Sequence, residues 1–250
     1  MLQRPLFPRI NRNSPLAKGL VFAGLGGGAS TLQMVDSSGY GNHGTLTNMD
    51  PATDWVWVPE LGRWGIGFSG VNNELVQIPK ALGDVKTISL WAVQAQGSYV
   101  HWTGASWNLK VIRFNTTANA TGVVYVQYDG VSPYWSSVPN PKDEAITHFV
   151  FQFTPTTVTM FRNGVSWGPK TVSVSFDSPI EMSNPELQPL TGPLADFMAW
   201  NRALSPSEIQ QLADPSNVLL SGLILPPVRR LWSVSSGAVF TEPMDRWVAA

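Results

Sequence analysis

Paired carboxylates would give this chain a hydrolytic centre, but the sequence does not offer them in a usable pattern. Cleavage of a glycosidic bond needs two carboxyl groups about 5–10 Å apart, which on one strand means acids two or four residues apart. The acids here are scattered, and the adjacent pair Asp143-Glu144 lies in a proline-rich stretch where the two side chains would point in different directions. We therefore expect a protein that is not an enzyme.

Other catalytic and metal-binding groups give no stronger signal. The three histidines, His43, His101 and His148, fall in a turn, a loop and a strand, without the spacing of a metal site. The chain has no cysteine, which excludes disulfides, thiolate metal sites and a cysteine nucleophile. A Ser-His-Asp triad is not local in sequence, so it stays open. We expect no catalytic residue, no resident metal and no cofactor.

The segment Asp36–Leu46 is the one place where a cation is a serious alternative. It holds three glycines and an asparagine in quick succession, which predicts a tight compound turn with positive φ at several points. Asp36 and Asn42, with turn carbonyls, could supply oxygen ligands to calcium. The interpretation we favour is an Asx-turn, in which the Asp36 carboxylate caps backbone amides and His43 makes local hydrogen bonds.

Aromatic side chains are the most suggestive surface groups. The chain has 11 tryptophans, and the candidate contact residues gather in two loop-like stretches. These residues are Tyr99, Trp102, Trp107, Tyr134 and Trp135. Such rings can stack on sugar faces or anchor a protein interface, and they can equally cap the open ends of a β-sandwich. All three roles stay open, with capping favoured.

Short alternating segments punctuated by proline and glycine make up the elements that would position these groups. Strands are predicted at Leu16–Leu25, Trp55–Val58, Trp64–Phe68, Leu75–Ile78, Thr87–Val93, Leu109–Phe114, Val123–Tyr128, His148–Phe153, Thr157–Arg162 and Val172–Phe176. Asn163-Gly164 is a strong hairpin signal. About a dozen short strands with turns between them predict an all-β, two-sheet antiparallel jelly-roll sandwich.

One strand-to-helix corner, Gly192–Leu212, closes this pattern. Its strand is predicted to place Ala195, Phe197 and Ala199 on one face and Leu194 and Asp196 on the other, together with Met198 and Trp200. Ser205, Pro206 and Glu208 then form the signature of a helix N-terminus with a capping box. This short C-terminal helix is the one convincing helix in the sequence.

The amino-acid composition limits the kinds of partner that this protein is expected to bind. There are 16 Lys and Arg against 17 Asp and Glu, with 43% hydrophobic and 13% charged residues. A large core can form, whereas the nearly balanced charge argues against the broad basic face that nucleic acid requires. The N-terminal residues do not read as a signal peptide, and no apolar run is long enough to span a bilayer. We expect a protein made and used in a cytoplasm or released by lysis, with neither nucleic acid nor membrane as partner.

Three regions follow from these patterns. Residues 1–15 are predicted to form an extended N-terminal arm, since repeated X-Pro units disfavour helix. Residues 16–213 form the sandwich, and residues 214–250 form an apolar C-terminal arm. Candidate docking residues in that arm are Arg229, Arg230, Trp232 and Trp247. An apolar tail is expected to dock, either on its own sandwich or on a neighbouring subunit.

Several motifs share a pattern with one known family. They are Leu16–Phe22, the turn Asp36–Leu46, Phe68-Ser-Gly70 with Val76–Pro79, Thr87–Trp91, the hairpin His148–Gly164, and Gly192–Glu208. Together they resemble the concanavalin A-like, laminin-G-like jelly-roll family, in the form common in bacterial and tailed-phage proteins, over roughly residues 16–213. Relatives carry two consecutive acids in the closing strand, whereas here Ala195 precedes Asp196, which weakens the transfer of acid-dependent roles such as calcium ligation.

The resemblance extends to function. The ending Pro226-Pro227-Val228-Arg229-Arg230-Leu231-Trp232 is similar to the tails of phage-encoded members, which implies a non-enzymatic virion component. Its expected role is that of a capsid decoration protein or a minor tail or fibre component. It would be assembled in the bacterial cytoplasm, as a homo-oligomer and through contacts with other virion proteins. The alternative is a carbohydrate-binding, lectin-like module that attaches the particle to host or environmental glycans.

Overall fold

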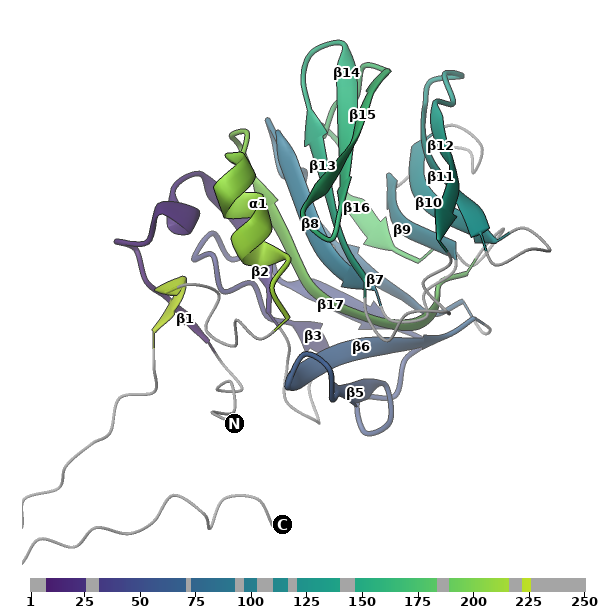
Figure 1. The fold of residues 1–250 in the computed structure, drawn as a ribbon. Helices are drawn as coiled ribbons and strands as arrows, with labels where there is room; N and C mark the ends of the chain where they lie inside the picture. The colour runs from purple at the N-terminus through teal and green to yellow at the C-terminus, as the bar shows by residue number, and fades with distance from the viewer. Residues whose placement is uncertain are drawn as a thin grey trace, which may run out of the picture.

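Two antiparallel β-sheets packed face to face make up most of the computed structural model (Figure 1). The structure describes residues 8–25, 32–70, 73–92, 97–102, 110–116, 121–139, 147–183, 189–215 and 222–225. The predicted all-β sandwich with one short C-terminal helix is confirmed. Among the helices of these ranges, none has the length and apolar character needed to cross a membrane.

One sheet, which we call the front sheet, forms one layer of the sandwich. Its strands are β3 (Gln33–Met34), β4 (Gly44–Thr47), β7 (Leu75–Ile78), β9 (Gly97–Trp102), β10 (Lys110–Thr116), β11 (Thr121–Tyr128), β12 (Tyr134–Pro139) and β16 (Ile180–Met182). They pair in the order β12-β11-β10-β9-β16-β7-β4-β3. Strands that are distant in sequence therefore lie side by side at its centre.

The other sheet, the back sheet, contains the strands with the strongest sequence signals. They are β2 (Leu20–Gly24), β5 (Trp55–Val58), β6 (Arg63–Ser69), β8 (Thr87–Ala92), β13 (Thr147–Phe153), β14 (Thr157–Arg162), β15 (Val165–Thr171) and β17 (Thr191–Trp200). The order is β15-β14-β13-β8-β17-β6-β5, with β2 paired to β17. The hairpin at Asn163-Gly164 is confirmed, with φ of 47° and 79° at the two turn residues.

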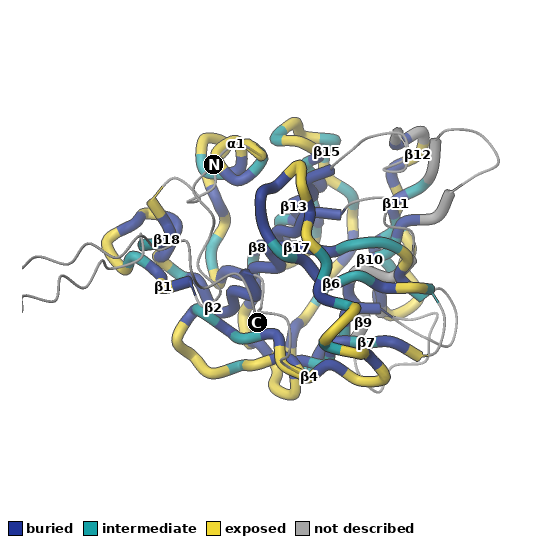
Figure 2. The backbone as a smooth tube through the Cα atoms, turned by 90° about the horizontal axis from the view of Figure 1, so that it is seen from below, coloured by how far each residue is buried: buried dark blue, intermediate teal, exposed yellow. Residues whose placement is uncertain are grey.

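The core lies between the inner faces of the sheets. Phe149, Phe151 and Phe153 of β13 share one face, as predicted, and belong to the same hydrophobic cluster as Ile112 and Phe114 of β10. Burying a side chain of this size stabilises the fold by about 1.5–3 kcal/mol. Figure 2 shows these buried stretches running through the central strands, with exposed residues concentrated in the connections.

A β-bulge in β17 changes the predicted facing of its residues. The pairing with β8 shifts between Ala195 and Met198, and Asp196 has φ of 49°. Leu194 and Phe197 both belong to the core cluster, whereas Ala195 packs on the outer side with Trp91. The predicted alternation is therefore wrong at Leu194 and Ala195, because a bulge inserts an extra residue and reverses the facing on one side of it.

The helix α1 (Pro206–Leu212) lies against the outer face of the back sheet (Figure 1). Its predicted capping box is present: the Glu208 amide donates to Ser205 Oγ, and the Ser205 amide donates to the Glu208 carboxylate. Arg202 binds the same carboxylate at 2.6 Å, and this contact holds the pKa of Glu208 at about 2. Ile209 and Leu212 pack into an apolar cluster with Trp200, so the corner acts as scaffold.

Two predicted strands differ from the structure. The segment Leu16–Leu25 divides into a 3-10 turn, η1 (Pro15–Ala17), and β2, because Gly19 at φ 71° breaks the strand. Residues 172–176 are not a strand, although Val172 and Phe176 are buried. The stretches that carry Tyr99, Trp102, Tyr134 and Trp135 were predicted as loops and are the strands β9 and β12.

Parts of both predicted arms pack on the sandwich itself. The strand β1 (Arg9–Ile10) pairs with β18 (Ile224–Leu225). Ile10, Leu223 and Ile224 are buried in the cluster that also contains the helix. Residues 1–7, 216–221 and 226–250 of the predicted arms lie outside the described residues.

Candidate functional site

A row of cross-strand partners crosses the outer face of the front sheet. Tyr134 on β12 pairs with Tyr125 on β11, and Tyr125 pairs with Arg113 on β10. Side chains alternate along a strand: Val124 and Val126 of β11 are fully buried in the core, whereas Tyr125 between them is partly exposed. We call Arg113, Tyr125 and Tyr134 the tyrosine row.

Each side chain of the tyrosine row contacts the next one across the sheet. The Tyr125 and Tyr134 rings lie 5.8 Å apart and are tilted by 46°. The Arg113 guanidinium lies 5.0 Å from the Tyr125 ring centroid, within the range of a cation–π contact. Tyr134 is 51% exposed. Its ring therefore faces solvent, while Tyr125 is held between its two neighbours.

The Arg113 guanidinium has no acidic counterpart in the ranges that the structure describes. Its Nε is buried and makes no hydrogen bond, and the contact recorded for its charge is with Tyr125. A buried donor of a charged group without a partner is costly. The tyrosine row thus contains a cation held in place by a ring rather than by a carboxylate.

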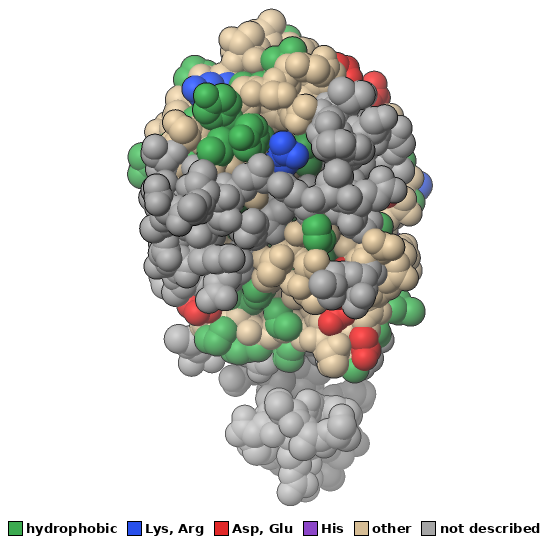
Figure 3. All heavy atoms as spheres, turned by 90° about the vertical axis from the view of Figure 1, so that its right-hand side faces the viewer, with side chains coloured by type: hydrophobic (Ala, Val, Ile, Leu, Met, Phe, Trp, Pro, Cys, Tyr) green, Lys and Arg blue, Asp and Glu red, His purple; other side chains and the backbone are tan. Residues whose placement is uncertain are grey.

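Polar side chains continue from the tyrosine row across the same outer face. Gln127 is the next outward residue of β11 and is partly exposed. Farther along the sheet Gln77 of β7 donates to Glu181 of β16 at 3.0 Å, and Thr45 of β4 pairs with Gln77. Figure 3 views the side of the molecule on which β10–β12 lie, and it shows hydrophobic side chains next to Lys or Arg. The face offers rings, amides and charges to a ligand.

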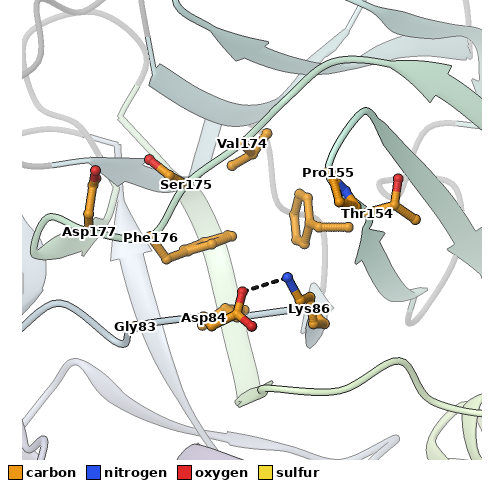
Figure 4. Close-up of a pocket in the computed structure, with 11 residues that line it drawn as sticks. Gly83, Asp84, Lys86, Thr154, Pro155, Val174, Ser175, Phe176 and Asp177 are labelled. Carbon is orange, nitrogen blue, oxygen red and sulfur yellow. Dashed lines mark ion pairs between the residues drawn. The ribbon is translucent and has the colours of Figure 1, made fainter.

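A second concavity, which we call the end pocket, opens at one end of the sandwich (Figure 4). It has a volume of about 210 Å³ and lies between residues 83–86, 153–155 and 174–177. Lys86 pairs with Asp84 at 2.5 Å, and in Figure 4 the Phe176 ring lies between Val174 and Asp84. Phe176 is only 3% exposed and packs edge-on against Phe153. Because Lys86 is paired with Asp84 and both phenylalanine rings are buried, the end pocket has less to offer a ligand than the tyrosine row.

A buried polar network occupies the outer side of the back sheet. The Ser89 Oγ and His148 Nε2 share a hydrogen bond of 2.8 Å, and the His148 ring lies 4.7 Å from that of Trp91. The Arg63 Nε contacts the Asp196 Oδ2 at 2.6 Å. Burial lowers the pKa of His148 to about 3, with Asp196 opposing the shift and Arg63 adding to it. His148 is therefore neutral at physiological pH.

This network does not have the accessibility of a catalytic site. Ser89 and His148 are both 0% exposed, so a substrate cannot reach the serine. A second serine, Ser166, stands in the pattern Gly164-Val-Ser-Trp-Gly168, which fits a nucleophile elbow by sequence. That elbow needs a strand-to-helix turn, whereas Ser166 follows a hairpin and lies in β15.

Asp36 acts as a cap in its turn. Its Oδ1 accepts hydrogen bonds from the amides of Ala23 and Ser38, and its Oδ2 accepts one from the amide of Asn42. The Asp36 amide donates to His43 Nδ1 at 3.0 Å. This is the predicted Asx-turn arrangement, in which amides occupy the oxygens that calcium would need. Within the described ranges, no group of three or more His, Asp or Glu side chains is placed to hold a metal.

The predicted contact residues fall into three groups. Tyr134 is exposed and belongs to the tyrosine row. Trp135 is 3% exposed and its Nε1 donates to Gly168 at 3.0 Å, so the prediction that Trp135 contacts a partner or glycan is corrected: it is a core residue. Tyr99 and Trp102 lie in β9, and the structure describes their backbone but not their side chains. Trp107, Arg229, Arg230, Trp232 and Trp247 lie outside the described residues.

Arg113 and Tyr125 are members of the site that sequence reasoning missed. The signal for Tyr125 was available, because Val123, Tyr125 and Gln127 alternate with residues that are buried in the core. The position of Arg113 depends on the pairing of β10 with β11, which the sequence alone does not reveal.

Solved structures share this architecture at low sequence identity. Domain 4 of AbnA, a GH43 extracellular arabinanase from Geobacillus stearothermophilus, in complex with arabinotriose, matches with a TM-score of 0.53 and 17% identity over 78% of this chain and 98% of that domain. The binding domain of Paraclostridial Mosquitocidal Protein 1 matches with a TM-score of 0.56 and 17% identity over 79% of this chain and 52% of the other.

A third match is a mutant of Trypanosoma rangeli sialidase displaying trans-sialidase activity, with a TM-score of 0.57 and 12% identity over 81% of this chain and 34% of the enzyme. The protein therefore spans about half of the mosquitocidal protein chain and about a third of the sialidase chain. At such identities the likeness establishes the fold alone. No curated protein matches the chain by sequence.

The sequence itself also matches a family. Residues 80–210, which run from β8 to α1 and include the tyrosine row, fit the profile described as the concanavalin A-like lectin/glucanases superfamily. Since this match covers half of the chain and the two-sheet architecture agrees with it, the protein belongs to the concanavalin A-like lectin/glucanases superfamily.

Proposed function

We propose that this protein is a non-catalytic carbohydrate-binding module and that the tyrosine row is its glycan contact. The observation that carries the proposal is the tilted pair Tyr125 and Tyr134, with Tyr134 half exposed on the outer face of a sheet. Tyrosine combines a large apolar face with a polar tip. A sugar presents the complementary combination of C–H faces and hydroxyl groups.

The surroundings of the row suit such a ligand. Ligand sites combine apolar rings with a few polar groups that fix orientation, and here Gln127 and Arg113 flank the Tyr125 ring. Strands lie about 4.8 Å apart, so the row from β10 to β12 extends roughly 10 Å. That span accommodates more than one sugar ring, and an oligosaccharide is the expected ligand.

The comparisons support a sugar ligand more than a purely structural role. The family description names lectins, and the AbnA domain was solved in complex with arabinotriose. Three of the described acids are held in ion pairs, which supports binding without catalysis for these groups. Asp196 is paired with Arg63, Glu208 with Arg202 and Asp84 with Lys86. A glycosidase would instead hold two carboxyl groups free on either side of the scissile bond.

A glycan array followed by titration calorimetry tests the proposal. We expect the protein to bind at least one oligosaccharide class, and Tyr134→Ala to lower the affinity roughly tenfold or more. Tyr40→Ala is the matched control, because Tyr40 is 63% exposed and lies in the Asp36 turn, away from the front-sheet row. Absence of binding to every glycan, or equal losses in the two variants, would refute the proposal.

The proposed setting of the module is a bacteriophage particle, where it would act as a capsid decoration or minor tail component. This part rests on the similarity of residues 226–232 to tails of phage-encoded proteins. Homo-oligomerisation and contacts with other virion proteins belong to the same proposal.

A truncated protein tests whether the C-terminal arm joins the module to the particle. Leu223 and Ile224 pack on the sandwich, so the arm should be removed after Leu225. A folded 1–225 protein that still joins the particle would count against a role for the arm.

A further inference from the structure

Arg113 is a cation that the described part of the fold leaves without an anion. The structure records no carboxylate or carbonyl partner for its guanidinium, and its Nε is buried without a hydrogen bond. Other partly or fully buried arginines are engaged: Arg63 contacts Asp196, and Arg202 contacts Glu208. The Arg63 guanidinium also lies over a ring, that of Trp91, but Arg63 has Asp196 as counterion. The contact shown for Arg113, in contrast, is with the Tyr125 ring.

We propose that Arg113 makes the tyrosine row selective for acidic glycans, those that carry a carboxylate or a sulfate group. The inference rests on the proposed carbohydrate-binding function and names its ligand class. The planar guanidinium can donate two parallel hydrogen bonds to a carboxylate or sulfate. Because Nε is buried, the terminal nitrogens are the donors that reach a ligand.

Contact with the Tyr125 ring orients the Arg113 side chain before a ligand binds. Stacking on an aromatic face restricts a long, flexible side chain before the ligand arrives, which reduces the conformational entropy lost on binding. The ring also shields one side of the guanidinium from water. An acidic group that approaches from the solvent side would therefore meet a cation that is already oriented.

The charge distribution on the outer face sets the orientation of the ligand. Glu181 lies on β16, two strands from β10, and is held by Gln77. Arg113 therefore places a positive charge at β10, whereas the side chain at that distance along the face is acidic. The acidic group is thus placed over β10 and β11, and the adjoining sugar ring falls toward the exposed Tyr134.

The test compares acidic oligosaccharides with matched neutral ones. The probes are a uronic acid oligosaccharide and its carboxyl-reduced form, a sialylated oligosaccharide and its desialylated form, and a sulfated oligosaccharide and its desulfated form. Calorimetry is done on the full chain for the wild type, Arg113→Gln, Arg113→Lys and Lys18→Gln. Lys18 is exposed beside the helix corner, so Lys18→Gln controls for the change in net charge.

We expect at least one acidic probe to bind roughly tenfold to a hundredfold more tightly than its neutral counterpart. Arg113→Gln should remove this preference for the acidic probe. Arg113→Lys should retain only part of it, and Lys18→Gln should retain all of it. The probe pair that shows the preference identifies carboxylate or sulfate as the group recognised.

Two other outcomes contradict the inference and can be told apart. If neutral and acidic probes bind equally, or if Arg113→Gln keeps the preference, the acidic selectivity is wrong while carbohydrate binding stands. If no probe and no array glycan binds the wild type, the carbohydrate-binding function fails and the selectivity fails with it. Circular dichroism of each variant confirms that the fold is intact.

Discussion

Tyr134 and Trp135 are consecutive in β12, yet Tyr134 is 51% exposed and Trp135 only 3%. The alternation of side chains along the strand sends Tyr134 to the outer face and Trp135 into the core beside Phe151. One of two neighbouring aromatic residues thus belongs to the surface and the other to the fold.

The pair predicts opposite effects of truncation. Trp135→Ala should lower the free energy of unfolding by about 3–5 kcal/mol, since it leaves a cavity and removes the donor to Gly168. Tyr134→Ala should change it by no more than about 1 kcal/mol while weakening glycan binding. Urea unfolding followed by fluorescence measures both values. Equal destabilisation by the two substitutions would show that Tyr134 is a packing residue.

The buried pair Arg63 and Asp196 should be sensitive to loss of either partner. Asp196→Asn keeps a side chain that tolerates the positive φ of 49° but leaves the guanidinium without its counterion. We expect a loss of about 3–5 kcal/mol in the free energy of unfolding. The comparison is Asp84→Asn, which removes an exposed partner of Lys86 and should cost about 1 kcal/mol or less. Similar losses at the two sites would contradict a buried ion pair.

His148 should make the fold sensitive to mild acid. Its pKa is about 3 in the folded state against 6.5 when unperturbed. As the pH falls below 6.5 the unfolded chain binds a proton that the folded chain excludes, so the free energy of unfolding decreases down to about pH 3. Above pH 6.5 both states are neutral and this contribution vanishes.

Urea unfolding at about pH 7 and about pH 5 measures the effect of His148. This window avoids Glu208, whose pKa of about 2 lies below its ordinary 4.5, so that its stabilising contribution is lost only at lower pH. His148→Gln should reduce the pH dependence, whereas Ser89→Ala, which keeps the histidine, should preserve it. An unchanged pH dependence in His148→Gln would contradict the assignment.

The helix cap gives a smaller, local prediction. Ser205→Ala removes the acceptor for the Glu208 amide and should lower the free energy of unfolding by about 1 kcal/mol. Gln210→Ala, in the exposed part of the same helix, should change it by about 0.5 kcal/mol or less. Thermal or urea unfolding checks both, and a Ser205→Ala protein as stable as the wild type would show that the cap contributes nothing.

The parts of the fold that were predictable are those with local signals. The β13–β14 hairpin follows from the alternating phenylalanines and Asn163-Gly164, and α1 follows from Ser205, Pro206 and Glu208, because these patterns act within a few residues. The bulge at Asp196 was not predictable, since it is a feature of the pairing between β17 and β8 and the residue contacts Arg63, which is distant in sequence.

The site was predictable only in part, for the same reason. Tyr134 was found as one member of an aromatic cluster, but its cluster neighbour Trp135 is in the core. Its actual partners, Tyr125 and Arg113, are set by strand register. Register is determined by long-range pairing, and a slip of one residue would exchange the two faces.

The measurement that bears most directly on the proposed function is a crystal structure of the full chain with the oligosaccharide that binds best in the array. We predict sugar density on the outer face of the front sheet, with a ring against Tyr134 and an acidic group within hydrogen-bond distance of Arg113. Sugar density in the end pocket or on the back sheet, with the tyrosine row empty, would contradict the assignment of the glycan site.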